Sequence, residues 1–398
     1  MRTTATGSTK SWIGAALVAS AASVALLATT ARTAASPAAT DAPPVAAKPR
    51  IDVAFVLDTT GSMGGLIEGA KSKIWSIANE MIRATPTPEI RIGLVAYRDR
   101  GDAYVTQVHD LSADIDAVYG TLRGFQADGG GDGPESVNQA LSDAVTKLSW
   151  SQDRKALKLV FLVGDAPPHM DYPQDQPYAR IVEAAVKKDL VIDTIQCGAD
   201  TETARVWQEI ARLGEGKFVA LGQTGDMVAV STPVDGEIAA LARELGKTAV
   251  GYGSDERRKE VEEKLSVAAA APAAVAADKA TFSARGGASG GIVTGEGDLV
   301  ADVAAGKARV ENLPAASLPP ALQAMEPEAR ADFVKQQVAK RAELTRQMNE
   351  LVAKRDALLA DERARAAASG AKDSFDSKVA ETVREHAQKK GIVYAESK

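Results

Sequence analysis

The sequence predicts an α/β fold, a doubly wound and mostly parallel sheet flanked by helices, over residues 50–252 of the 398-residue chain. Short apolar runs have the composition of strands that are buried on both faces. Between them, apolar residues recur at three- and four-residue spacing, which indicates helices. The two patterns alternate, and such alternation is typical of a parallel sheet with helices on its faces.

The first strand and the helix after it are the clearest elements. Six of the first seven residues of Ile51–Asp58 are apolar, which predicts a buried strand. Gly61, Gly64 and Gly65 then give the backbone the freedom for a tight turn. We expect the following helix at Met63–Arg83, where apolar residues repeat with helical spacing.

The remaining elements follow in the same order. Further strands are expected at Ile90–Tyr97, Ala103–His109, Leu157–Gly164, Leu190–Cys197 and Lys217–Leu221. Further helices are expected at Ser112–Gly124, Pro134–Leu148, Pro177–Lys188, Thr201–Arg212 and, as the closing helix, Asp235–Val250. Cys197 is the only cysteine and belongs to an expected strand, so we predict an inert buried thiol and no internal disulfide.

The N-terminal segment has the pattern of an export signal. Arg2 and Lys10 provide a basic start, and Trp12–Thr30 is apolar and uncharged, so residues 1–36 are expected to be a signal peptide. The alternative is an uncleaved membrane anchor, because a stretch of about 19 apolar residues approaches the length needed to span a membrane. Residues 37–49 read as a Pro/Ala linker. We expect an exported protein, periplasmic or secreted, that contacts a membrane only through an uncleaved export segment.

The composition changes beyond residue 252. Residues 253–326 begin with many charges and continue rich in Ala and Gly, which predicts a low-complexity linker. Residues 327–398 are expected to be a helical tail. Leu344, Leu351 and Leu358 are spaced by seven, which permits a coiled coil. A solvated helix that packs on the domain or on a partner fits the tail equally well.

Composition and motifs limit the classes of function. The net charge of −6 argues against a nucleic-acid-binding protein. The chain has three histidines and lacks the H-E-x-x-H, G-x-S-x-G and Walker A patterns. A metal-assisted phosphate hydrolase would require a second metal or a nucleophilic aspartate, together with a basic clamp, and the sequence has no recognisable partner of that kind. We therefore expect no enzymatic activity and keep the hydrolase as the less favoured alternative.

Oxygen-bearing side chains follow the first strand at alternate positions. Asp58, Thr60 and Ser62 lie at i, i+2 and i+4, so an extended loop would direct their oxygens to one side. Asp165 follows the run Leu157–Gly164, and the carboxyl ends of parallel strands share one edge of the sheet. Hard oxygen ligands suit Mg²⁺, and Mn²⁺ or Ca²⁺ would also fit. The simpler alternative is that these polar residues only cap a helix.

The Asp58-Thr-Thr-Gly-Ser62 motif resembles the D-x-[ST]-x-S signature of the von Willebrand factor A domain family. In that family the motif begins a metal-ion-dependent adhesion site, in which the cation binds an acidic side chain of a protein partner. The resemblance implies that a later Asp, here Asp165, reaches the metal, often through water. It also implies a ligand from a second loop, most often Thr. Here that Thr is absent, the nearest candidates are Asp132, Glu135 and Ser136, and Asp132 is the favoured one.

Four residues are expected to border this site as a partner-binding rim, namely Arg98, Asp99, Glu135 and His169. If Asp132 coordinates directly, three carboxylates surround a divalent ion, and a formal charge of about −1 would weaken attraction to an acidic partner. The expected function is that of an exported, non-catalytic binding protein that uses a divalent cation to bind a protein partner. The alternative is a structural envelope protein that assembles through its C-terminal helix.

Overall fold

The structure is a computed structural model that describes residues 48–131, 133–227, 231–286, 291–368 and 374–394. The described residues all belong to one compact unit, Ala47–Lys398. The expected signal peptide and nearly all of the expected linker at 37–49 lie outside the described residues. In the part of the chain that is described, no helix has both the length and the hydropathy to cross a membrane.

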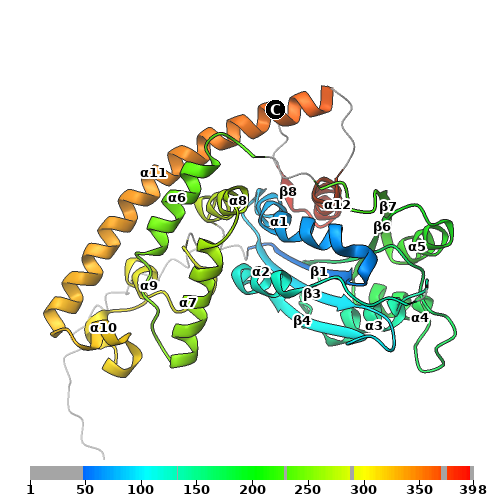
Figure 1. The fold of residues 1–398 in the computed structure, drawn as a ribbon, viewed down its shortest axis with the longest axis horizontal. Coiled ribbons are helices and arrows are strands. Elements are labelled where there is room, and N and C mark those ends of the chain that lie inside the picture. The colour runs from blue at the N-terminus through cyan, green and yellow to red at the C-terminus, as the bar shows by residue number, and fades with distance from the viewer. Residues whose placement is uncertain (1–47, 132, 228–230, 287–290, 369–373, 395–398) are drawn as a thin grey trace, which may run out of the picture. The chain divides into compact units, whose positions relative to one another are not determined.

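The central sheet has six strands in the order β4-β3-β1-β5-β6-β7. Their bounds are Arg50–Asp58 for β1, Glu89–Tyr97 for β3, Thr106–Ser112 for β4, Leu157–Gly164 for β5, Val191–Cys197 for β6 and Glu215–Leu221 for β7. Only β4 runs antiparallel to its neighbour, and all other pairs are parallel. The predicted doubly wound, mostly parallel sheet is therefore confirmed (Figure 1).

Alternate residues of β1 explain why both faces of the sheet are covered. Phe55 and Leu57 belong to one apolar core, and Ala54 and Val56 belong to another. The first core includes residues of helices α1 (Gly64–Met81) and α2 (Ile115–Gly124). The second includes residues of α3 (Val137–Lys147), α4 (Tyr178–Val186) and α5 (Thr201–Leu213). A strand that is buried on both faces has to be apolar throughout, which is why the continuous run in the sequence predicted it.

The first core is completed by the C-terminal end of the chain. Helix α12 (Phe375–Lys389) packs on α1 (Figure 1), and the ring of Phe375 lies 6.2 Å from that of Phe55. After it, β8 (Val393–Tyr394) pairs antiparallel with β2 (Ala84–Thr85). The helix expected to close the domain at Asp235–Val250 does form, as α6 (Asp235–Gly246), but it packs on α8 and α11 rather than on the sheet. This corrects the predicted domain end at residue 252, because α12 belongs to the sheet domain.

Residues 226–374 separate the sheet from α12, and we call them the helical insert. Besides α6, the insert contains α7 (Asp255–Ala269), α8 (Ala273–Ala284), α9 (Leu299–Ala304), α10 (Pro320–Gln323) and α11 (Pro327–Ala368). The expectation of a linker over 253–326 is thus wrong. Alanine has the highest helix propensity, and here the Ala-rich segment forms a packed helix in which Val275, Ala277 and Phe282 are buried.

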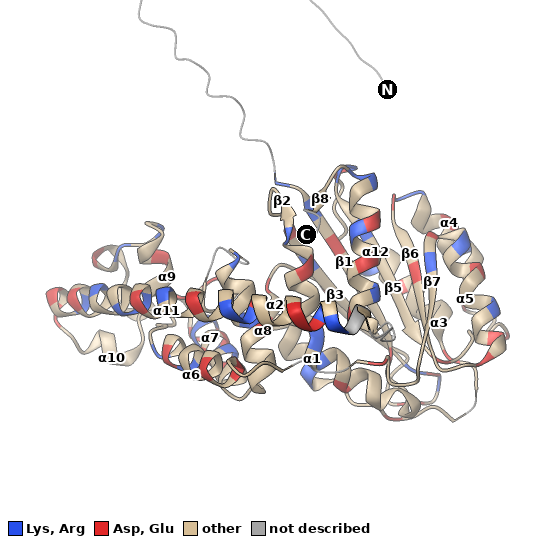
Figure 2. Cartoon of the chain, turned by 90° about the horizontal axis from the view of Figure 1, so that it is seen from above, with Lys and Arg blue, Asp and Glu red and all other residues tan. Residues whose placement is uncertain are grey.

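The apolar stripe of α11 packs within the chain. Leu344 and Leu351 contact a core formed with α6 and α8. The two arginines that interrupt the stripe have acidic partners, since Arg341 pairs with Asp298 and Arg355 pairs with Asp235. Figure 2 shows acidic and basic residues interspersed along the ribbon of this helix. The apolar stripe of α11 therefore packs against other helices of the insert, and a coiled coil with another chain stays a prediction.

Candidate functional site

The site begins at Asp58, the last residue of β1, which is fully buried. Its Oδ1 accepts hydrogen bonds from the backbone N–H of Thr60 at 2.8 Å and from the Thr60 hydroxyl at 2.6 Å. The hydroxyls of Thr60 and Ser62 are 3.3 Å apart. The three oxygen-bearing side chains therefore do gather at one point, as their spacing suggested. The other carboxylate oxygen, Oδ2, is buried and has no hydrogen-bond partner among the described residues.

Glu135 brings a second buried carboxylate to the same place. Its backbone N–H donates to the carbonyl of Pro167 at 2.9 Å, and its own carbonyl accepts from the N–H of His169 at 3.0 Å. These bonds fix the loop before α3 against the loop after β5. The side chain is 3% exposed, and its Oε2 has no hydrogen-bond partner in the described part of the chain. The sequence placed Glu135 at the rim, whereas the structure buries it next to Thr60.

The glycine-rich loop makes this close approach feasible. Gly130 has a φ of +78°, and a Cβ at this position would lie 3.1 Å from Cβ of Thr60 and 3.2 Å from Oε1 of Glu135. A side chain at Gly130 would therefore crowd both of the groups that face the site and would also strain the backbone. Asp132, two residues further along, lies outside the described residues, so the structure does not place the favoured loop ligand.

Asp165 follows β5 on the same edge of the sheet. Its Oδ2 accepts a hydrogen bond from Nε2 of Gln223 at 2.5 Å, and the same nitrogen lies 3.4 Å from the carbonyl oxygen of Ser62. Gln223 was not identified from the sequence, although its position just after β7 was a usable signal, because that strand end meets the same sheet edge. Gln223 thus connects the loops that carry Ser62 and Asp165.

The carboxylates of Asp58, Glu135 and Asp165 repel one another, and this repulsion disfavours their ionised forms. Burial, with a smaller contribution from the charge of Asp165, raises the pKa of Asp58 to about 7, against the hydrogen bonds from Thr60 that favour the anion. Burial, followed by the charges of Asp58 and Asp99, raises the pKa of Glu135 to about 9. A divalent cation would offset this repulsion, so the donor set fits a metal ion.

The site opens to solvent as a hollow of about 470 Å³. Four segments of the chain line it, and the lining residues include Thr60, Ser62, Gly130, Glu135, Asp165 and, at the start of α5, Asp200 and Glu202. No three His, Cys, Asp or Glu side chains among the described residues are arranged to hold a metal by themselves. The hydroxyls of Thr60 and Ser62 would therefore have to supply part of any coordination shell.

The three other residues expected at the rim are largely buried and hold loops together. Arg98 is 5% exposed and donates to the carbonyls of Thr59, at 3.1 Å, and Gln126, at 2.8 Å. Asp99 accepts hydrogen bonds from the Ser136 hydroxyl at 2.9 Å and from the Tyr172 hydroxyl at 2.7 Å.

His169, also buried, pairs through Nδ1 with Asp171 at 2.8 Å, and its ring stacks on that of Tyr172 with the centroids 4.1 Å apart. Together with the contacts of Arg98 and Asp99, this supports the floor of the site.

The sheet region is similar in sequence to proteins of one domain family. Residues 52–223 match a family model described as von Willebrand factor A domain. An ariadne-like RING finger protein of Acanthamoeba polyphaga mimivirus is 30% identical over 155 residues, which are 39% of this chain and 15% of that protein. Von Willebrand factor A domain-containing protein 7 of Homo sapiens is 26% identical over 196 residues, which are 49% of this chain and 21% of that protein. The chain thus spans a small part of these relatives.

Solved structures with a similar arrangement are more distant. Proximal thread matrix protein 1 from the mussel byssus matches with a TM-score of 0.35 and 17% identity, over 44% of this chain and 43% of that chain. The VWA domain of SpRpn10 matches with a TM-score of 0.34 and 17% identity, over 47% of this chain and 96% of that chain.

Proposed function

Residues 52–223 of this chain are a von Willebrand factor A domain, and from that premise we propose that the protein is an exported, non-catalytic binding protein that holds a divalent cation and binds a protein partner through it. A domain of this family suggests a role in protein interaction. One observation carries the finer proposal: at the same sheet edge, two buried carboxylates, Asp58 and Glu135, each keep an oxygen that has no hydrogen-bond partner among the described residues. Leaving such groups unsatisfied is costly, and a cation would satisfy both.

The proposed ligand set is Asp58, Thr60, Ser62, Glu135 and Asp165, with Mg²⁺ as the first choice and Mn²⁺ or Ca²⁺ also suited to oxygen ligands. Glu135 replaces Asp132 as the favoured loop ligand, because its carboxylate borders the same glycine as Thr60. A bound cation would supply an electrophilic position for a carboxylate of the partner. Asp58 and the hydroxyls hold the ion from the β1 side, and Asp165 holds it from the β5 side.

The charge of the site bears on the choice of partner. With Asp58, Glu135 and Asp165 all ionised around a divalent ion, the formal charge would be about −1, which disfavours an acidic ligand. The raised pKa of Glu135, about 9, keeps this side chain protonated near neutral pH when no cation is bound. Were Glu135 to keep its proton in the loaded site, the charges of the cation and the two remaining carboxylates would balance. An acidic partner would then meet a neutral site rather than a negative one.

The proposal is tested by titrating Mg²⁺, Mn²⁺ and Ca²⁺ into the chelator-treated whole chain by calorimetry. The whole chain is required because α12 completes the core of the sheet domain. Saturable binding that is lost in Asp58→Asn is expected. Asp171→Asn is the matched control, since this carboxylate is 75% exposed and lies near the site without lining it. Absence of binding in the wild type, or equal binding in Asp58→Asn, would refute the metal site.

Export and partner binding need their own measurements. Export rests on the sequence of residues 1–36, and the N-terminal residue of the protein recovered outside the cytoplasm would test it. A cleaved N-terminus near residue 36 supports a signal peptide, and an intact one in the membrane fraction supports the anchor. For the partner, binding to a surface of immobilised acidic peptide should require the cation and disappear with chelation.

A further inference from the structure

A second hollow lies in the helical insert, away from the proposed cation site. It has a volume of about 390 Å³ and is bounded by α6, α7, α8 and α11, with Trp75 of α1 and Tyr119 of α2 at one side. This volume falls in the range of about 300–1,000 Å³ that is usual for small-molecule sites. It also exceeds the engineered apolar cavity of about 150 Å³ that binds benzene in another protein.

Small side chains create this hollow. Its α8 wall consists of residues such as Ala276 and Ala280, and its α7 wall includes Ala268. Methyl groups cannot fill the space between four helices, so the alanine-rich sequence that suggested a linker instead leaves an apolar chamber. Trp75 is completely buried and forms a T-shaped contact with Phe282, with the ring centroids 5.4 Å apart. Trp75 therefore lines the inner side of the hollow, and Phe282, which does not line it, packs against the Trp75 ring.

The charged residues that line the hollow are all cationic. They are Arg243, Lys247, Lys279 and Arg341. Lys279 pairs with Asp116, Arg341 pairs with Asp298, and Lys247 pairs with Glu244. Arg243 has no hydrogen-bond or ion-pair partner for its side chain among the described residues, and it is exposed. Apart from these ion-paired cations and a few small polar side chains, the lining of the hollow is apolar, and on its solvent side Arg243 presents an unpaired guanidinium.

We propose that this hollow binds a long-chain fatty acid, with the alkyl chain between α7, α8 and α11 and the carboxylate at Arg243. An apolar chamber suits an alkyl chain, because each buried methylene contributes about 0.8 kcal/mol of transfer free energy. A guanidinium at the solvent side suits a carboxylate, which it binds with charge-assisted hydrogen bonds. An uncharged alkane would fit the apolar chamber but make no interaction with the Arg243 guanidinium, and a ligand with a cationic head group would be repelled by it.

Trp75 gives the test a local reporter. Titration of the whole chain with dibromostearate should quench tryptophan fluorescence, since bromine quenches an indole that it contacts, and Trp75→Phe should remove most of the quenching. Trp150 and Trp207 belong to the core on the opposite face of the sheet and do not line the hollow. Unlabelled stearate should reverse the quenching.

Two kinds of variant separate the chain from the head group. Ala280→Leu should fill the chamber and weaken stearate binding at least about tenfold, the factor equivalent to 1.4 kcal/mol. Ala276→Leu serves the same purpose if Ala280→Leu does not fold, as judged by circular dichroism. Arg243→Gln should weaken stearate binding by about the same factor but leave stearyl alcohol binding unchanged. Arg346→Gln is the matched control, because Arg346 is an exposed arginine of α11 that does not line the hollow.

Three results would overturn the proposal. The first is an absence of quenching in the wild type. The second is quenching that persists in the filled variants, which would place the fatty acid elsewhere. The third is an equal loss of stearate and stearyl alcohol in Arg243→Gln, which would remove the role of the carboxylate. Metal titration is independent of all three, so the cation site and the fatty-acid site can fail separately.

Discussion

The backbone N–H of Phe375 donates a 3.0 Å hydrogen bond to the carbonyl oxygen of Gly225. The two ends of the helical insert therefore meet at one point of the sheet domain. Beyond this point the chain continues as α12, whose Val379 and Val383 are buried in the same core as Phe55. The sheet domain is thus interrupted in sequence and continuous in space.

Removal of the Phe375 side chain should destabilise the sheet domain. Phe375→Ala leaves a cavity against Phe55 and is expected to lower the free energy of unfolding by about 3–5 kcal/mol. Deletion of residues 375–398 should prevent stable folding. Both are measured by thermal and denaturant unfolding. The control is Leu351→Ala in the insert, where the side chain is only partly buried. If the chain that ends at residue 374 unfolds like the wild type, α12 is not part of this core.

The site should make the metal-free protein less stable as pH rises. For Asp58 the pKa goes from 3.8 to about 7 on folding, and for Glu135 it goes from 4.5 to about 9. The folded state therefore binds more protons than the unfolded state between about pH 4 and pH 9, and its stability falls across that range. Melting temperatures in chelator at pH 5 and pH 8 measure the effect.

The same measurement in Asp58→Asn and Glu135→Gln provides the control for the pH effect. Each variant should flatten the pH dependence, because it removes one group whose pKa is raised. Added Mg²⁺ should stabilise the wild type most at pH 8, since cation binding requires ionised carboxylates. A wild-type melting temperature that rises steadily from pH 4 to pH 9 in chelator would contradict the assigned shifts.

Comparison of two acidic residues of one loop tests the ligand assignment. Glu135→Gln should weaken Mg²⁺ binding at least about tenfold. The substitution removes a carboxylate that coordinates the ion directly, and losing that contact is expected to cost more than about 1.4 kcal/mol of binding free energy. Asp132→Asn should change the affinity by less than about threefold, since a charge that does not coordinate acts only at a distance. Calorimetry of both variants decides between them, and the reverse order of effects would restore Asp132 as the loop ligand.

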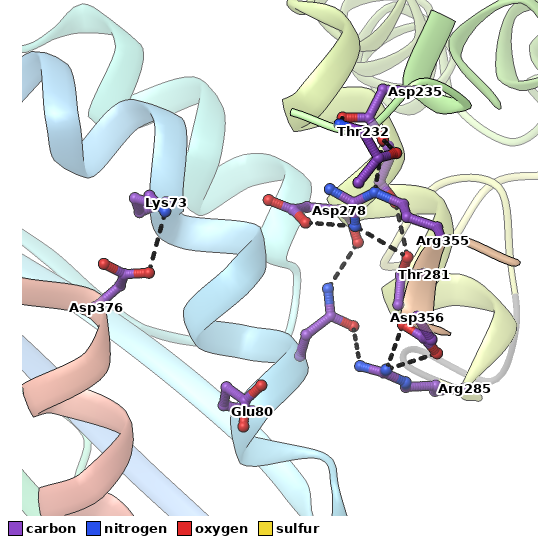
Figure 3. A network of polar contacts seen from close by, with 12 residues as sticks. Lys73, Glu80, Thr232, Asp235, Asp278, Thr281, Arg285, Arg355, Asp356 and Asp376 are labelled. Atoms are coloured by element: carbon purple, nitrogen blue, oxygen red, sulfur yellow. Dashed lines mark hydrogen bonds and ion pairs between the residues drawn. The ribbon is translucent and has the colours of Figure 1, made fainter. Parts of the chain in front are cut away.

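The buried Arg355 connects three helices of the insert. It donates to Asp235 of α6 and Asp278 of α8, both at 2.8 Å. Beside it, Arg285, which follows the end of α8, pairs with Asp356 of α11 (Figure 3). Burial raises the pKa of Asp278, and the guanidinium of Arg355 opposes that rise. Removing the guanidinium would leave buried carboxylates without a counter-charge.

Arg355→Met is accordingly expected to cost about 3–5 kcal/mol of stability. The control is Arg346→Met, because Arg346 on the same helix is 60% exposed where it pairs with Glu350, which is 67% exposed. Such a surface pair contributes about 0–1 kcal/mol. Denaturant unfolding measures both variants. Equal effects would mean that the buried network contributes no more than a surface pair.

The local pattern of apolar and polar residues in the sequence was enough to predict much of the sheet domain. The strand Ile51–Asp58 was recognisable because burial on both faces requires continuous apolar residues, which are visible without any knowledge of neighbours. The grouping of Asp58, Thr60 and Ser62 was also predictable, since it depends only on alternation along an extended loop. Asp165 was placed by the rule that the carboxyl ends of parallel strands share an edge.

Tertiary structure decided everything that depends on residues far apart in sequence. Glu135 became a site residue only because its loop bonds to Pro167, and the sequence alone could not show which acidic residue of that loop turns inward. The alanines near Ala276 predicted a linker by composition, yet they form a helix that packs against α1, α6 and α11. The position of α12 against Phe55 is of the same kind. The spacing of apolar residues predicts which face of a helix is buried, but the element against which that face packs is determined only by the tertiary structure.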